Sequence, residues 1–195
     1  MRSGEFARST KETRVRASVT IEGTGKAEIR TGIGFLSHLL SLLSYHGLFD
    51  IFVEAEGDRE VDDHHIVEDI GICLGEAFSR ALGDRSGIKR FGWASIPMDE
   101  TLVHVALDLS GRDYLVYNVD LEDPWTGDFD TRLLEDFLMA FSRHIGANIH
   151  VDKVRGRSPH HVAEALFKAL GISLDMATAK EERRSEIPST KGVIV

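Results

Sequence analysis

Two short segments of this sequence carry the same metal-binding side chains, a pair of adjacent histidines followed three positions later by a glutamate. The first segment is DHHIVEDI at residues 63–70, and the second is PHHVAEAL at residues 159–166. Together, imidazole and carboxylate groups bind divalent ions from manganese to zinc. A single histidine pair on a helix is usually solvated or part of a cap. Two copies in one register predict a pair of transition-metal ions that do chemistry on a small soluble substrate.

The spacing within each segment assigns its side chains to two different ions. On a helix, residues four apart share a face, so His64 and Glu68 can hold one ion between them. His65 points about 100° away, because an α-helix has about 3.6 residues per turn, and it must reach the other ion. The same reasoning applies in the second copy to His160, Glu164 and His161. His65 and His161, the second histidine of each pair, are called the offset histidines. Each site should therefore combine the His and Glu pair of one segment with the offset histidine of the other segment.

Each ion needs a further ligand, and two histidines are candidates. His38 lies in the apolar segment GFLSHLL, and His150 precedes His160 by ten residues. These two candidates are not related by the repeat, so a symmetric argument does not select them. The other unmatched histidines are His46, His104 and His144, for which no direct role is expected.

Patterns of apolar residues indicate the elements that must position these side chains. Alternation at every second residue predicts half-buried strands, and helical spacing predicts amphipathic helices. The first part of the chain is predicted to contain strands at 14–21, 26–31 and 49–55 and helices at 33–45 and 62–82, with the first two strands paired across the turn at 23–25. The second part is predicted to contain strands at 102–109, 114–121 and 149–154 and helices at 131–145 and 159–177.

The order strand, strand, helix, strand, helix thus occurs twice, and each copy ends in a helix that carries a histidine pair. An α+β fold of two duplicated β-β-α-β-α halves, related by a pseudo-twofold axis, buries its apolar faces most simply by packing the helices between two sheets. The predicted halves are residues 1–85 and residues 86–195 with the C-terminal tail, joined near the turn-forming stretch 83–87. We expect one compact domain, because 195 residues leave no room for a separate regulatory module.

Composition argues against several classes of partner. The formal net charge is -9, from 23 basic and 32 acidic residues, which opposes binding to nucleic acid or to an anionic membrane. The apolar stretches are too short for a membrane span, and residues 1–11 lack the apolar run of a secretory signal. Cys73 is the single cysteine, and its helical apolar neighbours indicate a core position. A reducing cytoplasm is the expected location.

Longer motifs give the chain a resemblance to a known family. The segments are GFLSHLL, DDHHIVEDIGI, RFGWASIPMDE, DLSGRDY, HHVAEALFKAL and IPSTKG. In this order and at these spacings, they resemble imidazoleglycerol-phosphate dehydratase, a lyase of histidine biosynthesis, from about Thr10 to the end of the chain. The resemblance implies two manganese ions, one held by His38, His65, His160 and Glu164 and the other by His64, Glu68, His150 and His161. This partition agrees with the helical phase.

The implied reaction removes water from imidazoleglycerol phosphate to form imidazoleacetol phosphate. Two ions that bracket the substrate's imidazole would stabilise it as an imidazolate and allow a diazafulvene-like intermediate. The resemblance assigns proton transfer at the substrate carbon to Glu12, which would otherwise be read as an ordinary surface carboxylate. Glu68 and Glu164 are committed to metal but could relay a proton. Asp99 is a weaker candidate for orienting a ligand or the substrate.

The resemblance also implies a phosphate site and an assembly. The phosphate is expected to bind residues at Arg90, Arg112, Lys168, Ser189, Thr190 and Lys191, and PSTKG resembles a small anion-binding loop. A homo-oligomeric cage of about 24 subunits, with metal sites between subunits, is implied as well. The chain departs from the family pattern at Ser37, Leu42 and Asp113, none of which is a predicted ligand.

Two other functions fit a double histidine and carboxylate site. A metallohydrolase would activate water, and its ions usually share a bridging carboxylate at a separation of about 4 Å. The motif pairing predicts separate ions instead. A metal-storage or assembly protein would fill every coordination position with protein ligands. Metal binding without turnover of any imidazole compound would favour storage.

Overall fold

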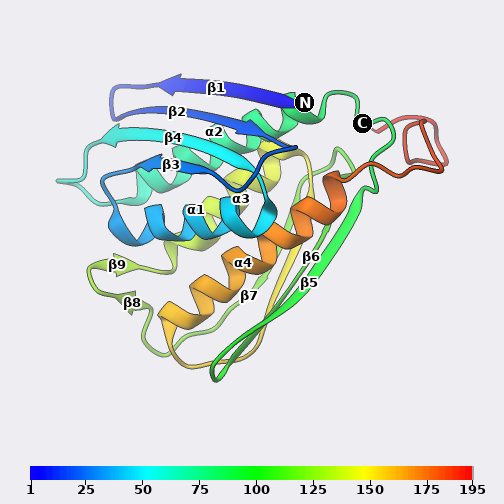
Figure 1. Ribbon diagram of the computed structural model, residues 1–195. Coiled ribbons are helices and arrows are strands. Elements are labelled where there is room, and N and C mark those ends of the chain that lie inside the picture. Colours follow the sequence, from blue (N-terminus) through cyan, green and yellow to red (C-terminus); the bar gives the residue numbers. More distant parts are fainter. Residues whose placement is uncertain (195) are drawn as a thin grey trace.

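The computed structural model describes residues 1–194, which form two four-stranded sheets, a two-stranded sheet and four helices (Figure 1). The elements up to residue 82 are β1 (Ser3–Ser9), β2 (Thr13–Thr20), β3 (Ala27–Arg30), α1 (Gly34–Gly47), β4 (Asp50–Gly57) and α2 (His64–Leu82). The later elements are β5 (Phe91–Met98), β6 (Thr101–Asp108), β7 (Tyr114–Asn118), β8 (Trp125–Thr126), β9 (Phe129–Asp130), α3 (Leu133–Ile145), β10 (Asn148–Arg155) and α4 (Pro159–Thr178).

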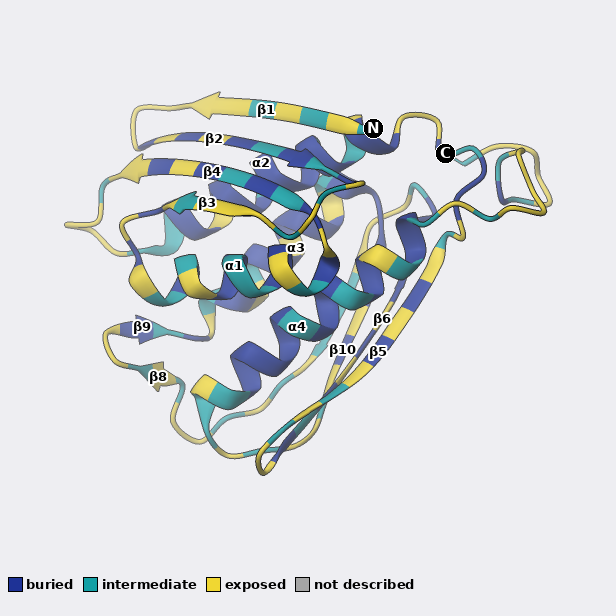
Figure 2. Ribbon diagram, viewed as in Figure 1, coloured by how far each residue is buried: buried dark blue, intermediate teal, exposed yellow. Residues whose placement is uncertain are grey.

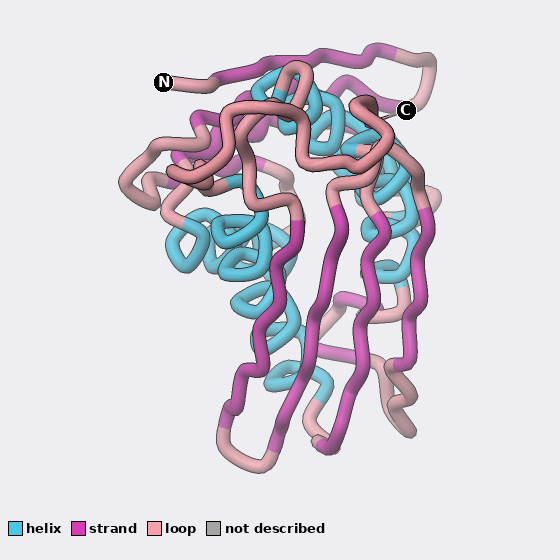
Figure 3. Tube along the Cα trace, turned by 90° about the vertical axis from the view of Figure 1, so that its right-hand side faces the viewer, coloured by secondary structure: helices cyan, strands magenta, loops and turns pink. Residues whose placement is uncertain are grey.

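The helices lie between the two large sheets, and Figure 3 shows the second sheet standing in front of the helix layer. The strand orders are β1-β2-β4-β3 and β5-β6-β10-β7, so both sheets have the same topology, with two antiparallel pairings followed by one parallel pairing. The first sheet is covered by α1 and α2, and the second by α3 and α4. Where the two helix layers meet, α2 packs on α3 and α1 on α4. The predicted pseudo-twofold α+β sandwich is confirmed.

Alternating apolar residues give each large sheet one buried face. In β2, Val15 and Ala17 are buried, while Arg14 and Arg16 point to solvent. Figure 2 shows the buried helix faces in the centre and alternating buried and exposed positions along β2, β4 and β5. Cys73 on α2 is fully buried, as predicted, and burial raises the pKa of its thiol to about 12. Within residues 1–194, every helix is too short or too polar to span a bilayer.

Each large sheet begins with a strand that the apolar pattern did not reveal. β1 pairs with β2 and β5 pairs with β6, so each half has the order β-β-β-α-β-α, with the β8–β9 hairpin inserted before α3 in the second half. β1 is a largely exposed edge strand, and in β5 the large side chains of Phe91 and Trp93 point outward, while Gly92 and Ala94 face the core. The predicted pairing of strands 14–21 and 26–31 is wrong, because β3 pairs in parallel with β4 and β1 takes the place beside β2.

Two glycines let these first strands approach the helices closely. Gly4 on β1 lies against the carbonyl oxygen of Ala77 on α2, and Gly92 on β5 lies against that of Ser173 on α4. In both places a Cβ atom would overlap the helix backbone. Ala77 and Ser173 are 96 positions apart, the same spacing as the two histidine pairs. The contact is therefore repeated with the motif, while the boundary between the halves at residue 85 stays a prediction.

Gly92→Ala should destabilise the protein, because the added methyl group must displace α4 or push β5 away from it. Overpacking of this kind costs about 1–3 kcal/mol, so the urea midpoint of unfolding, followed by circular dichroism, should fall. Gly34→Ala is the matched control, because its Cβ would have nothing within 4 Å and a compatible Gly→Ala change stabilises by about 0.4–1 kcal/mol. Equal stability of the two variants would contradict the packing of β5 on α4.

Candidate metal centre and anion pocket

Both histidine pairs lie at the start of a helix, and α4 shows how the sequence places them there. Ser158 is the N-cap residue, and its side chain accepts a hydrogen bond from the backbone N–H of His161. The first turn of α4 then presents His160 and His161 with ring centroids 6.1 Å apart and planes at 86°. The pair at the start of α2 has centroids 6.0 Å apart and planes at 74°. In both pairs the rings point in different directions, as the helical phase predicts.

α1 and α4 bring three predicted ligands together. Nε2 of His38 on α1 and Nε2 of His160 on α4 each lie 2.9 Å from Oε1 of Glu164. One ligand atom from each residue lies within 4.8 Å of the others, which is close enough for one ion to contact all three. Glu164 is buried, whereas both imidazoles are partly exposed, so the cluster opens to solvent. Two imidazole nitrogens and a carboxylate oxygen suit a divalent transition metal.

The carboxylate of Glu164 is held in its ionised form. Burial alone would raise the pKa of Glu164, but hydrogen bonds with Lys168, His38 and His160 outweigh burial and lower the pKa to about 2. The ammonium group of Lys168 lies 2.8 Å from Oε2, on the side away from the imidazoles. Glu164 is thus available as a ligand without first losing a proton. Lys168 thus lies beside this cluster, and its role as a phosphate ligand stays a prediction.

The second predicted ligand set is only partly assembled within one chain. His64 on α2 faces Asp136 on α3, with 3.5 Å between Nδ1 and Oδ2. Glu68 lies one turn further along α2 and is exposed. An imidazole and two carboxylates therefore occur where α2 meets α3, which mirrors the meeting of α1 and α4.

His150 does not lie near the other members of its predicted set in this chain. It lies on β10 between Ile149 and Val151, which are both buried. Because alternate residues of a strand point to opposite faces, His150 points outward from the second sheet, away from the helices that carry His64 and His161. It lines a surface hollow of about 350 Å³ with Trp93, Ser95, His104 and Asp152.

Asp136 is a candidate site residue that the sequence analysis missed, although the repeat contains a signal for it. Ser44 on α1 and Ser142 on α3 each donate a hydrogen bond to the carbonyl group five residues further on, at 2.8 and 2.7 Å. These serines are 98 positions apart, and so are His38 and Asp136. Asp136 is therefore the counterpart of His38. Aligning the two helices on their serines would have placed it opposite His64.

The turn between β1 and β2 brings Glu12 to the start of α2. Its Oε2 atom lies 4.0 Å from Nδ1 of His65. Asp58, in the loop before α2, lies closer, at 3.1 Å from the same nitrogen, and this hydrogen bond raises the pKa of His65. Glu12 is exposed, so its carboxylate can reach a molecule bound beside His65.

The turn between β5 and β6 holds the other offset histidine. Nδ1 of His161 lies 2.8 Å from Oε2 of Glu100. Asp99, the weaker sequence candidate, is exposed, and its Oδ2 lies 3.8 Å from Nε2 of His161, beyond hydrogen-bond range. Among residues 1–194, the three-ligand cluster at Glu164 includes neither offset histidine.

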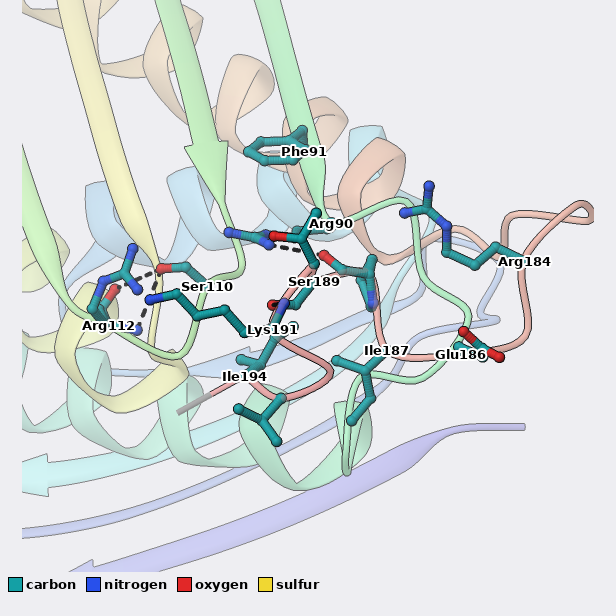
Figure 4. Close-up of a pocket in the computed structure, with 13 residues that line it drawn as sticks. Arg90, Phe91, Ser110, Arg112, Arg184, Glu186, Ile187, Ser189, Lys191 and Ile194 are labelled. Carbon is teal, nitrogen blue, oxygen red and sulfur yellow. Dashed lines mark hydrogen bonds between the residues drawn. The ribbon is translucent and has the colours of Figure 1, made fainter.

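Most of the predicted phosphate ligands gather in one pocket near the C-terminus. A cavity of about 560 Å³ is lined by Arg90, Arg112, Ser189, Thr190 and Lys191, together with Ser110 and Arg184. Figure 4 shows Arg90, Arg112 and Lys191 converging on it from different segments. Cationic groups and hydroxyls in this arrangement are suited to an anion such as a phosphate.

The metal cluster and the anion pocket lie at opposite ends of α4. His160 is in the first turn of this helix, whereas the backbone N–H of Arg90 donates to the carbonyl group of Ala177, near the last turn. The helical rise between these two points is about 25 Å, at about 1.5 Å per residue. A small substrate cannot span that distance within one chain.

Known proteins are similar to this sequence over all or nearly all of its length. A family model described as imidazoleglycerol-phosphate dehydratase matches residues 31–174. The protein of that name from Syntrophobacter fumaroxidans is 54% identical over 193 residues, which cover 99% of this chain and 98% of that protein. The protein of the same name from Methanocella arvoryzae is 50% identical over 194 residues, which cover 100% of both chains.

Solved structures show the same fold. Imidazoleglycerol-phosphate dehydratase from Staphylococcus aureus superposes with a TM-score of 0.83 at 36% identity, over 92% of this chain and 99% of that chain. The enzyme from Pyrococcus furiosus, solved in complex with (S)-C348, superposes with a TM-score of 0.84 at 37% identity, over 96% of this chain and 99% of that chain.

The lowered pKa of Glu164 makes the stability of the metal-free protein depend on pH. Since the folded pKa is about 2 and the ordinary value is 4.5, folding favours the ionised form. The stabilisation is therefore present above pH 4.5 and is lost as the pH falls toward 2. The shift corresponds to roughly 3 kcal/mol. In chelator, Glu164→Gln should lower the free energy of unfolding at neutral pH and reduce its loss on acidification.

Urea unfolding of the chelated protein between about pH 7 and pH 3 measures this dependence. Glu68→Gln is the matched control, because Glu68 is the exposed counterpart of Glu164 in the repeat. The control should keep the wild-type pH dependence. A wild-type pH dependence in Glu164→Gln would contradict the role of the buried carboxylate.

Proposed function

The chain belongs to the imidazoleglycerol-phosphate dehydratase family and is a hydro-lyase of histidine biosynthesis, and from this premise we propose that it holds two manganese ions around the imidazole of its substrate. The observation that carries the proposal is the cluster of His38, His160 and Glu164, in which two imidazole nitrogens converge on one ionised carboxylate oxygen. Imidazole with a carboxylate suits the harder ions of the first transition series, manganese among them.

The first ion would bind His38, His160 and Glu164. His65 lies outside this cluster in the same chain, so we infer that a neighbouring copy supplies it. The second ion would bind His64, Glu68 and His161, again from different copies. Asp136 takes the place that His150 was predicted to fill, because it faces His64 at 3.5 Å, while His150 points away from the helix layer.

Dehydration of this substrate breaks one C–O bond and one C–H bond. Imidazoleacetol phosphate has a methylene group next to the ring and a ketone on the next carbon. The hydroxyl therefore leaves from the carbon attached to the ring, because there the electrons of the ionised imidazole can expel it and form a diazafulvene. A proton then leaves the next carbon, the electrons of that C–H bond restore the aromatic ring, and the enol becomes the ketone. When bound, the ions supply the positive charge that favours the ionised imidazole.

Glu12 is the proposed base for that proton. Its exposed carboxylate lies 4.0 Å from Nδ1 of His65, so it is next to any substrate held at the ion that His65 binds. Glu164 is a poor base, because its pKa is about 2. Glu68 is exposed and could relay a proton, but it would be committed to the second ion.

The anion pocket is proposed to bind the substrate's phosphate through Arg90, Arg112, Ser189, Thr190 and Lys191. Because the pocket and the metal cluster of one chain are about 25 Å apart, the phosphate and the imidazole must contact different copies. This requirement supports self-association, for which a closed homo-oligomer of about 24 subunits is our proposal. A cytoplasmic location stays a prediction.

The two rival functions lose their support. Family membership identifies a dehydratase rather than a metallohydrolase or a storage protein. In addition, the proposed ligand sets share no residue, so no bridging carboxylate joins them, unlike in most two-metal hydrolases.

Removing metal should abolish activity, and manganese should restore it. Protein treated with chelator is expected to form no imidazoleacetol phosphate from imidazoleglycerol phosphate, whereas readdition of Mn²⁺ restores turnover. His160→Ala should lower kcat/KM by more than about 100-fold in saturating Mn²⁺, because the charge on the substrate loses its support. If the wild-type protein takes up stoichiometric Mn²⁺ but forms no product, the dehydratase mechanism is wrong and a metal-storage function is favoured.

Mixing two inactive variants tests the division of the site between copies. His160→Ala disables the metal cluster, and Arg112→Ala disables the anion pocket. If each site takes these parts from different copies, randomly mixed oligomers should recover about one quarter of wild-type activity, since one site in four combines two intact parts. A mixture of His160→Ala with Glu164→Gln, both in the metal cluster, is the matched control and should recover none. No recovery in the first mixture would place both parts in one chain.

A further inference from the structure

The two offset histidines share a contact that their helices do not explain. Nδ1 of His65 lies 3.1 and 3.2 Å from the two carboxylate oxygens of Asp58. Nδ1 of His161 lies 2.8 Å from Oε2 of Glu100. In each case the carboxylate comes from a loop outside the helix and meets the same ring nitrogen.

These contacts decide which ring nitrogen carries the proton. An ionised carboxylate can only accept a hydrogen bond, so Nδ1 must donate. In the neutral imidazole the proton then stays on Nδ1, and Nε2 keeps its lone pair. Metal ligation needs that lone pair, and a carboxylate behind a ligating histidine also fixes the ring orientation and raises its basicity.

Glu100 is itself held firmly. Its Oε1 atom accepts hydrogen bonds from the backbone N–H groups of Ser158 and Arg157 at 3.1 and 3.4 Å, while Oε2 accepts from His161. One carboxylate thus joins the β5–β6 turn, the loop before α4 and the imidazole. A second carboxylate near the ring is that of Asp99, whose Oδ2 lies 3.8 Å from Nε2, beyond hydrogen-bond range.

Asp58 is placed by the neighbouring turn. Its backbone N–H donates to the carbonyl group of Glu12 at 3.2 Å, and its own carbonyl group accepts from Val61 at 2.8 Å. The side chain of Asp58 is only 19% exposed, whereas that of Glu12 is 60% exposed, so Asp58 stays behind the ring and Glu12 remains open to solvent.

We propose that Asp58 and Glu100 are positioning residues that hold His65 and His161 in the Nδ1–H tautomer, with Nε2 directed to a metal ion. The inference rests on the proposed two-metal function. The two carboxylates are not equivalent in the repeat, since Asp58 precedes its histidine on the chain by a short loop and Glu100 reaches it from a distant turn. The two halves therefore arrive at one contact by different routes, as expected if the contact serves a need common to both histidines.

The test is Co²⁺ binding to chelator-treated protein, followed by equilibrium dialysis and by the visible d–d absorption of the ion. Asp58→Ala and Glu100→Ala should each weaken binding by about 10–100-fold and shift the absorption bands. Asp58→Asn and Glu100→Gln keep a carbonyl oxygen that can accept from Nδ1, so they should recover part of the loss. The exposed Glu60, two residues from Asp58, serves as the matched control, and Glu60→Gln should match the wild type.

The outcomes test the two-metal function and the positioning role separately. If the wild-type protein fails to bind two Co²⁺ ions per chain, the proposed two-metal function is wrong. If it binds them and all four variants keep the wild-type affinity and spectrum, the positioning role is wrong while the metal function stands. The Asn and Gln variants remain informative if an alanine variant does not fold, because a purely structural role would lower stability without shifting the absorption bands.

Discussion

The close crossing of helices from opposite halves is the contact on which the rest of the structure depends. At Gly75 on α2, a Cβ would lie 2.9 Å from the carbonyl oxygen of Phe141 on α3, and at Gly171 on α4, it would lie 2.7 Å from that of Leu43 on α1. Each sheet buries only one face of its two helices. The opposite faces of these helices must therefore be buried against the helices of the other sheet. Because small residues let the backbones approach, side chains near the helix starts come within ligand distance. The cluster of His38, His160 and Glu164 is a product of this packing.

Equivalent positions in the two repeats keep the same backbone contacts, but their side chains differ in chemical type. The crossing glycines are 96 positions apart and their partners are 98 positions apart, so both crossings use equivalent residues. Yet the residue that α1 contributes is His38 and the one that α3 contributes is Asp136. One crossing therefore forms a cluster of three ligand groups within a single chain, while the other leaves its glutamate exposed. The two halves therefore share the backbone geometry of the crossing, while the side chains at equivalent positions differ.

The sequence predicted those parts of the molecule in which the spacing of the residues alone determines the structure. The two histidine motifs and the four helices were found because helical spacing determines both burial and direction, whereas His38 was placed with His160 and Glu164 only by the resemblance to a known family. β1 and β5 were missed because their inward positions include glycine and alanine, whose role is close approach rather than apolar bulk. His150 was predicted for this ligand set and Asp136 was not considered, because the candidates for the further ligand were histidines only. The structure shows instead that the repeat register, which carries no preference for histidine, identifies the residue opposite His64.

Charge pairing within the anion pocket assigns different tasks to its basic residues. Asp108 pairs with Arg90 at 2.6 Å and raises its pKa, and the guanidinium also donates to the carbonyl group of Pro188, so Arg90 ties the C-terminal segment to the second sheet. Within residues 1–194, the side chains of Arg112 and Lys191 form no salt bridge, although both line the cavity. Unpaired cations at a cavity wall gain most from an incoming anion, because that anion neutralises them without displacing an existing partner. Arg90 therefore ties the wall of the pocket together, while Arg112 and Lys191 are the cations best placed to take up the phosphate that we propose binds there.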